Sequence, residues 1–173
     1  MSICVLKKTL QELYEAYKNG SRVVIREEGY NFESMCVFHA PATSHDISRL
    51  LEKYPNMPKD YLEFLSITNG LAPFIETDFF GGGDIYRIDS VLEFNAAIKH
   101  PARISVAYIS DDYIIIDLDD VRSGKSEYMY VLESISDFDD ARSLYCDFQT
   151  WFNRYIMAQG NKYWTWRVED RKF

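Results

Sequence analysis

Patterns that mark common metal and catalytic sites are scarce in this sequence. The 3 cysteines (Cys4, Cys36 and Cys146) form no C-x-x-C pair, and the 3 histidines show neither H-x-x-x-H nor H-E-x-x-H spacing. Zinc sites need such pairs because several ligands must converge on one ion. A G-x-S-x-G elbow is absent, and no cysteine has a histidine partner evident from the sequence. We therefore predict no metal, no cofactor and no catalytic residue, in a protein that is not an enzyme.

Long apolar runs are also missing. No stretch approaches the roughly 18 consecutive apolar residues that a membrane-spanning helix needs. The N-terminal residues lack the apolar segment of a secretory signal. Three widely spaced cysteines, an odd number with apolar neighbours, are typical of small buried thiols in a reducing compartment. We expect a cytoplasmic protein that does not bind membranes.

Basic residues are the minority, since 19 Lys and Arg stand against 27 Asp and Glu for a net charge of −8. Nucleic acids and anionic membrane surfaces select basic protein faces, so both classes of partner are disfavoured. The excess of acid is local, because residues 111–140 hold ten acids and two bases. The ten acids are Asp111, Asp112, Asp117, Asp119, Asp120, Glu127, Glu133, Asp137, Asp139 and Asp140.

Part of this acidic segment is comparable with a calcium loop. Asp117, Asp119 and Asp120 are possible calcium ligands, but Val121 occupies the third acidic position of the loop pattern, and the required glycine and distal glutamate are missing. The structural alternative is the solvent-exposed edge of a β-meander. A pair of carboxylates acting as general acid and base depends on tertiary structure, which the sequence does not define.

Apolar residues recur at helical spacing in five segments of the chain. Ser44 is predicted to cap the second helix, Pro58 to start the third and Pro101 to stop the fourth. The fifth is expected to begin near Asp139-Asp140, whose charges suit the positive end of a helix dipole. The predicted helices cover residues 6–17, 44–54, 58–68, 91–98 and 139–156.

Extended segments fill the intervals between the predicted helices. They comprise a hairpin over 21–41, two short strands over 74–88 around a glycine turn, and a meander over 104–109, 113–118 and 128–132. Alternation of Trp164, Trp166 and Val168 suggests a final strand, which packs on the sheet or, alternatively, exposes an aromatic anchor. We predict a single α+β domain over residues 1–173. Its mostly antiparallel sheet has about six strands, with helices packed at the N-terminus, middle and C-terminus.

Residues 57–70, Met-Pro-Lys-Asp-Tyr-Leu-Glu-Phe-Leu-Ser-Ile-Thr-Asn-Gly, resemble the signature of the SUKH superfamily, the group of the Smi/Knr-like proteins. That signature has Leu-Pro, an acidic residue with Tyr, a Phe-Leu pair and Asn-Gly, and Met57 departs from it by replacing the usual Leu. The order of helix, signature, acidic meander and closing helix extends the resemblance over 44–158. The motif positions with an expected structural role are Pro58, Tyr61, Phe64, Asn69 and Gly70.

The resemblance implies a protein-binding domain and supplies no catalytic residue. Bacterial members resemble immunity proteins that neutralise polymorphic toxins, often nucleases, and fungal members resemble intracellular regulatory scaffolds of cell-wall synthesis. The first implication agrees with the local acidity, because an acidic surface attracts the basic groove of a nuclease. An acid/base enzyme is the remaining alternative. The candidate partner-binding residues for a basic toxin domain are Asp111, Asp112, Asp117, Asp119, Asp120, Asp137 and Asp139.

Overall fold

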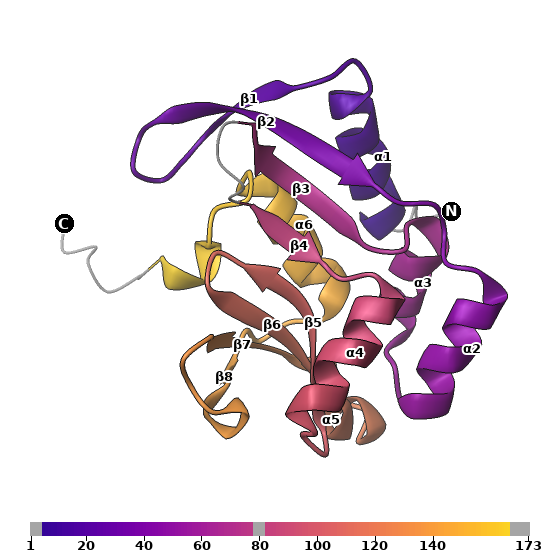
Figure 1. Cartoon of the computed structure of the whole chain (residues 1–173). Helices are drawn as coiled ribbons and strands as arrows, with labels where there is room; N and C mark the ends of the chain where they lie inside the picture. Colours follow the sequence, from indigo (N-terminus) through magenta and orange to yellow (C-terminus); the bar gives the residue numbers. More distant parts are fainter. Residues whose placement is uncertain (1–4, 78–81, 167–173) are drawn as a thin grey trace.

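Eight strands form one antiparallel sheet in the computed structural model, which describes residues 5–77 and 82–166 (Figure 1). The strands lie in the sheet in chain order, so every neighbour in space is also a neighbour in sequence. The helices are α1 (Val5–Tyr17), α2 (Ser44–Lys53), α3 (Lys59–Ile67), α4 (Ile88–Ile98), α5 (Leu118–Arg122) and α6 (Phe148–Met157), with short 3-10 helices η1 (Phe138–Asp140) and η2 (Tyr163–Thr165). The strands are β1 (Arg22–Ile25), β2 (Asn31–Phe38), β3 (Leu71–Glu76), β4 (Gly83–Ile85), β5 (Arg103–Ile109), β6 (Asp112–Asp117), β7 (Met129–Glu133) and β8 (Arg142–Ser143).

The α+β fold class is therefore confirmed, although the sheet has eight strands where about six were expected. The first hairpin, the meander and the helices at the N-terminus and middle lie where the sequence predicts them. None of the helices in the described part of the chain is long and apolar enough to cross a membrane.

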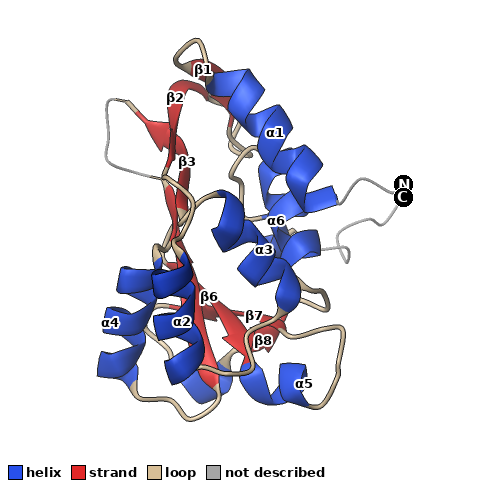
Figure 2. Cartoon of the chain, turned by 90° about the vertical axis from the view of Figure 1, so that its right-hand side faces the viewer, coloured by secondary structure: helices blue, strands red, loops and turns tan. Residues whose placement is uncertain are grey.

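Two groups of helices cover opposite sides of the sheet (Figure 2). On one side α1, α3 and α6 pack together, and Tyr155 of α6 contacts Phe74 of β3 at a ring-centroid distance of 6.2 Å. On the other side α4 packs against β5, with α2 beside it. There Phe94 of α4 lies 5.0 Å from Tyr113 of β6. On this second side Phe138 of η1 also lies 6.0 Å from Tyr113.

Aromatic rings fill the core between α3 and α6. Four side chains of α6 point inward and are at most 1% exposed, as the predicted stripe requires: Phe148, Trp151, Phe152 and Tyr155. They meet Tyr61 and Phe64 of α3, with ring-centroid distances of 5.0 Å for Tyr61–Phe148 and 5.4 Å for Phe64–Phe152. Edge-to-face and offset ring pairs of this kind stabilise a core beyond the area they bury.

The Asn69-Gly70 end of α3 also positions α4. The Asn69 side-chain oxygen accepts a hydrogen bond from the Ile88 amide at 3.0 Å. This bond caps α4, because the residue before that helix, Arg87, makes no side-chain cap of its own. At the other end of α3, the buried Pro58 is the N-cap residue. The motif thus does more than start and stop one helix.

The predicted start of the closing helix near Asp139-Asp140 is wrong. These two acids lie in η1, and β8 then pairs with β7 before α6 begins at Phe148. The N-cap of α6 is Asp147, whose carboxylate accepts a bond from the Thr150 amide at 2.7 Å. A side-chain bond at the N-terminus outweighs a favourable charge in an earlier turn, so the cap decides the boundary.

The predicted final strand is also wrong in its described part. Residues 163–165 form η2, while Val168 lies outside the described residues. Trp164 is buried, and its indole N–H donates to the Asp112 carboxylate at 2.8 Å. Trp166 is 55% exposed and donates to Glu27 at 2.5 Å. Trp164 therefore packs on the sheet, the first of the two alternatives for the aromatic tail.

Smaller differences concern helix ends. The N-cap of α2 is Thr43 and not Ser44, because Thr43 forms a reciprocal capping box with Asp46. The helix α4 begins at Ile88, three residues before the predicted start, and ends at Ile98 as predicted, with the left-handed Lys99 (φ +58°) as its C-cap residue. A short helix, α5, interrupts the meander where a turn was expected.

The outer edge of β1 is covered by side chains that follow α6. The Ile25 amide donates to the Gln159 side chain at 3.1 Å, and the Ile25 carbonyl accepts from the Asn161 side-chain amide at 3.1 Å. The Glu27 amide donates to the same Asn161 side chain at 3.1 Å. Two carboxamides thus take the place of a neighbouring strand.

Replacing Gly70 tests how closely the signature approaches α4. Gly70 has φ +84°, and a Cβ atom there would lie 2.8 Å from both the Arg87 nitrogen and the Ile85 carbonyl oxygen. Gly124 is the matched control, because its φ is +80° and a Cβ would meet nothing within 4 Å. We expect Gly124→Ala to lower the free energy of unfolding by about 1–2 kcal/mol, the cost of a left-handed alanine. Gly70→Ala should lose about 1–3 kcal/mol more through overpacking.

Urea denaturation of both variants and the unmodified chain measures this difference. Equal losses at the two positions would contradict the close approach, because they would show that the backbone beside Gly70 yields without cost.

Candidate partner-binding surface

The ten acids of residues 111–140 fall into two groups by exposure. Asp112, Asp117 and Asp120 are buried, at 4%, 8% and 9% exposed, and each has partners in its own chain. The other seven acids are exposed and lie on the β5–β6 turn, on α5, at the last residue of β7 and in the connections that flank β7. The acidic segment is therefore partly an internal network and partly a surface.

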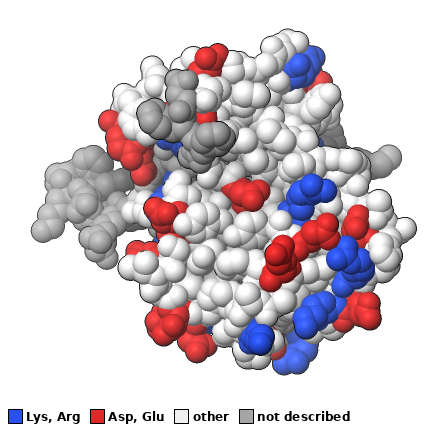
Figure 3. All heavy atoms as spheres, in the orientation of Figure 1, with Lys and Arg blue, Asp and Glu red and all other residues white. Residues whose placement is uncertain are grey.

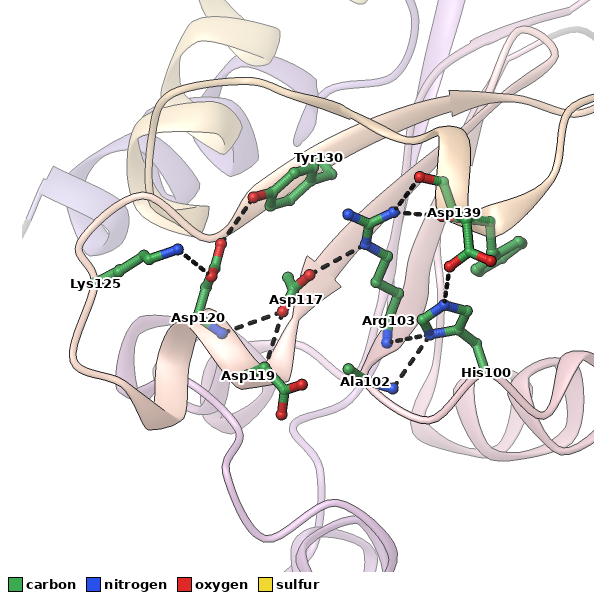
Figure 4. Close-up of polar contacts among 10 residues, drawn as sticks. His100, Ala102, Arg103, Asp117, Asp119, Asp120, Lys125, Tyr130 and Asp139 are labelled. Atoms are coloured by element: carbon green, nitrogen blue, oxygen red, sulfur yellow. Dashed lines mark hydrogen bonds and ion pairs between the residues drawn. The ribbon is translucent and has the colours of Figure 1, made fainter.

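Asp117 ties three elements together at the end of β6 (Figure 4). One carboxylate oxygen accepts the amides of Asp119 and Asp120 at 3.1 Å each and so caps α5. The other accepts from the Arg103 side chain at 3.1 Å. The same guanidinium donates to the carbonyls of Phe138 and Asp139, at 2.7 and 2.9 Å, and thus fixes η1 from the inside.

Asp120 lies between two donors of its own chain (Figure 4). Lys125 Nζ is 2.6 Å from one carboxylate oxygen, and the Tyr130 hydroxyl donates to the other at 2.8 Å. Burial acts to raise the pKa of Asp120, but the bonds from Lys125 and Tyr130 outweigh it and bring this pKa below its ordinary value. The charge of Asp120 is thus matched internally.

Asp112 binds the residues that follow α6. Its carboxylate accepts from the Trp164 indole at 2.8 Å and lies 3.2 Å from Lys162 Nζ. Lys162 also donates to the Ser110 carbonyl at 3.0 Å. These contacts fasten the C-terminal part of the described chain across the β5–β6 turn, and Asp112 is only 4% exposed, so its charge is not presented at the surface.

The structure thus divides the seven candidate partner-binding residues. Asp112, Asp117 and Asp120 face their own chain, and Asp119 is exposed but paired with Arg122 at 2.9 Å. The remaining three are exposed and are joined by two further acids, Glu133 and Asp140, which the seven-residue set omits. We define the acidic rim as Asp111, Glu133, Asp137, Asp139 and Asp140.

The strands β6 and β7 bring Asp111 and Glu133 of the acidic rim together. Asp112 pairs with Glu133 across the two strands, and the Ser134 amide donates to the Asp111 carbonyl at 2.9 Å. Figure 3 shows acidic side chains grouped at the lower left, over the loop between β7 and β8, whereas acidic and basic groups alternate over α2 and α4 at the lower right. Within the described residues, no lysine or arginine lies at ion-pair distance from the rim carboxylates.

His100 holds one rim carboxylate in place. Its Nδ1 accepts the amides of Ala102 and Arg103, at 3.2 and 2.8 Å, so the ring proton resides on Nε2. That Nε2–H donates to Asp139 at 3.1 Å (Figure 4). With Nδ1 committed to two donors, the imidazole is neutral in this geometry and leaves the negative charge of Asp139 uncompensated.

The signature acid, Asp60, is a half-buried carboxylate and a candidate general acid or base. Burial raises the pKa of Asp60, against the opposing effect of its hydrogen bonds. Its oxygens accept from the Tyr128 hydroxyl at 2.5 Å and from the amides of Gln149 and Tyr61 at 2.8 and 2.9 Å. Three donors from its own chain occupy the group, and the bond to Gln149 supports the first turn of α6. These bonds give Asp60 a structural role.

Neutralising Asp120 or its neighbour Asp119 separates the internal network from the surface. Asp120→Asn places an amide nitrogen against either the Lys125 or the Tyr130 donor, and we expect the free energy of unfolding at pH 7 to fall by about 1–3 kcal/mol. Asp119→Asn removes an exposed pair and should change it by less than about 1 kcal/mol. Urea unfolding of the two variants beside the unmodified chain measures both effects.

The pH dependence has a defined sign. The pKa of Asp120 is lower in the folded than in the unfolded chain, so its contribution to stability is complete above the unfolded value of about 4 and is lost as the pH falls below it. Asp120→Asn should therefore lose less stability than the unmodified chain between pH 7 and pH 3. If the free energy of unfolding of Asp120→Asn fell as much as that of the unmodified chain over this pH range, or more, the lowered pKa of Asp120 would be contradicted.

Comparison with known proteins agrees with the signature at residues 57–70. A family model described as the SMI1 / KNR4 family (SUKH-1) matches residues 41–154. Two proteins of Bacillus subtilis (strain 168), the uncharacterized proteins YnaB and YobM, are similar to this chain. YnaB is 32% identical over 129 residues, covering 73% of this chain and 85% of YnaB. YobM is 27% identical over 160 residues, covering 87% of this chain and 85% of YobM.

The matched region contains both the signature and the whole acidic rim. The β1–β2 hairpin and the residues that cover its edge lie outside it. Because the family model spans about two thirds of the sequence, the resemblance at residues 57–70 is confirmed, and this chain belongs to the SMI1/KNR4 (SUKH-1) family.

Proposed function

We propose that this chain is a non-enzymatic, immunity-type protein that binds and neutralises a basic toxin domain through its acidic rim. The observation that carries the proposal is the rim itself, five exposed carboxylates without lysine or arginine partners in the described chain. Membership of the SMI1/KNR4 (SUKH-1) family is consistent with such a binding role.

The rim is a better candidate than the acidic segment as a whole. Asp112, Asp117, Asp119 and Asp120 are each within ion-pair distance of a cation of this chain. A partner would have to displace those cations before it could use the carboxylates. The rim carboxylates are exposed to water, where they attract a cationic partner over about a Debye length of 8–10 Å and accelerate encounter.

A basic nuclease domain suits this surface because its substrate groove is already positive. An acidic surface that covers such a groove competes with the nucleic acid for the same charges. Binding alone then blocks the toxin, so the proposal needs no chemistry from this chain. The outcome for the cell is protection from a toxin carried by its own lineage or delivered by a neighbour.

The first experiment identifies the partner and tests its toxicity. The tagged full chain is used to capture proteins from lysate of its source organism, with elution by stepped salt and identification by mass spectrometry. Each basic candidate is then expressed with and without this chain, and cell growth is measured. Growth arrest that co-expression of this chain relieves supports the proposal.

Charge reversal tests whether the rim is the surface involved. Glu133→Lys, Asp137→Lys and Asp140→Lys together reverse three exposed rim acids that make no ion pair in the described chain. We expect the association rate with the captured toxin at low salt to fall about tenfold or more, and its dependence on salt to weaken. Stopped-flow or surface-based kinetics at two or more salt concentrations measure both quantities.

The matched control reverses three exposed acids away from the rim, Glu28, Glu52 and Glu93, and so changes the net charge equally. An equal slowing in both triple variants would mean that net charge alone acts, and the rim would lose its role. Capture of a non-toxic wall-synthesis or signalling protein would instead favour the regulatory-scaffold alternative.

A further inference from the structure

A cavity of about 450 Å³ opens beside the acidic rim, between the end of α4 and the η1 connection. Its lining includes Tyr113 of β6, Phe138 of η1 and His100, together with the rim acids Asp137 and Asp139. The aromatic part belongs to the sheet side that carries α4, and the carboxylates stand at the mouth. The cavity therefore combines an apolar floor with negative charge at one place.

The aromatic rings of the lining lie close to one another. The Phe138 ring lies 6.0 Å from Tyr113 at an interplanar angle of 40°, and 6.1 Å from His100 at 34°. All three side chains are half-buried, so each keeps part of its surface toward the cavity. The face of an aromatic ring carries partial negative charge and attracts a cation placed over it.

The charge of the cavity is set by two carboxylates and one ammonium group. Asp137 is exposed without an ion-pair partner in the described chain, and the Asp139 side chain is 90% exposed with neutral His100 as its hydrogen-bond donor. Lys99 also lines the cavity and is exposed, so its long side chain can turn into solvent. The acidic groups of the lining are Asp137 and Asp139.

The wall that carries these acids is held rigid from its inner side. Arg103 bonds the carbonyls of Phe138 and Asp139, and its guanidinium stacks 5.0 Å from the centre of the Tyr130 ring while it pairs with Asp117. Arg103 thus shows, inside the same protein, that an arginine is satisfied by a tyrosine face, a carboxylate and carbonyl oxygens. A preformed wall also reduces the entropy lost when a ligand binds.

We infer that this cavity receives an arginine side chain of the basic partner, with its guanidinium over the Tyr113 and Phe138 rings and between the Asp137 and Asp139 carboxylates. This inference rests on the proposed function, because the basic partner is the toxin domain proposed there. Arginine fits better than lysine because its planar group both stacks on rings and pairs with carboxylates. A metal ion fits less well, since no three His, Cys, Asp or Glu side chains gather into a metal-binding group in the described part of the chain.

The test uses the full-length chain and three blocked tripeptides, acetyl-Gly-X-Gly-amide with X as arginine, lysine or citrulline. Titrations are followed by NMR of the aromatic and backbone groups. We expect saturable shifts at Tyr113, Phe138 and Asp139 with the arginine peptide, about threefold weaker binding of the lysine peptide, and no saturable shift with neutral citrulline.

Two double variants separate the cavity from the general field of the rim. Asp137→Asn with Asp139→Asn keeps an oxygen for the His100 bond and should weaken the arginine peptide about fivefold. Glu133→Gln with Asp140→Asn removes the same charge outside the cavity lining and should weaken it by less than about twofold. Phe138→Leu keeps an apolar contact but removes the ring face, so it should abolish the preference for arginine over lysine.

Three results would each overturn the inference: no saturable shift with the arginine peptide, equal effects of the two double variants, or shifts centred away from the cavity. These results are distinct from failure of the proposed function. If a captured toxin binds the Asp137→Asn, Asp139→Asn variant with unchanged affinity, the immunity role stands and the arginine site fails. If the peptide binds in the cavity but no toxic partner is neutralised, the arginine site stands and the immunity role fails.

Discussion

The Asp60 carboxylate and the Asn69 carboxamide stand at opposite ends of α3, and each supports the first turn of another helix. Asp60 accepts the Gln149 amide of α6, and Asn69 accepts the Ile88 amide of α4. Between them Tyr61 and Phe64 enter the aromatic core. Since α6 and α4 cover opposite sides of the sheet, one nine-residue helix sets the position of both layers. This dependence gives a physical reason for a short family signature: a change in either polar residue would leave a helix terminus without its bond. The rim depends on the same arrangement, because α4 bounds the side on which it lies.

Local patterns predicted much of this architecture, and distant pairings account for what they missed. The stripe from Phe148 to Tyr155 has helical periodicity, and the meander consists of short apolar runs separated by turn residues, so the α6 face and β5–β7 could be predicted. The start of α6 could not, because Asp139, Asp140 and Asp147 all qualify as N-terminal acids until β8 is known to pair with β7. The candidate site divides in the same way. Lys125 lies five residues after Asp120 across a glycine turn and could have been proposed as its partner, whereas the Trp164 contact of Asp112 spans 52 residues.

Charge counted along a sequence differs from charge presented to a partner. Residues 111–140 carry a net charge of −8, equal to that of the whole chain. Folding brings Arg103 and Lys162 to this segment from outside it and directs three carboxylates inward. The surviving exposed acids then lie together at one side of the sheet. Internal and external acids consequently have different roles. Asp117 positions η1 through Arg103, whereas the exposed Asp139 and Asp140 belong to η1 itself.

The carboxamides of Gln159 and Asn161 have a consequence for solubility and for the boundaries of a usable fragment. An unpaired edge strand with exposed apolar residues, as β1 is with Val23 at 67% and Ile25 at 57%, is a template for pairing with another chain. The two side chains block its hydrogen-bonding edge at Ile25 and Glu27. They lie five and seven residues past the end of the family match at residue 154. A fragment cut at that limit would retain every strand of the sheet, yet it would expose an adhesive edge and self-associate through it.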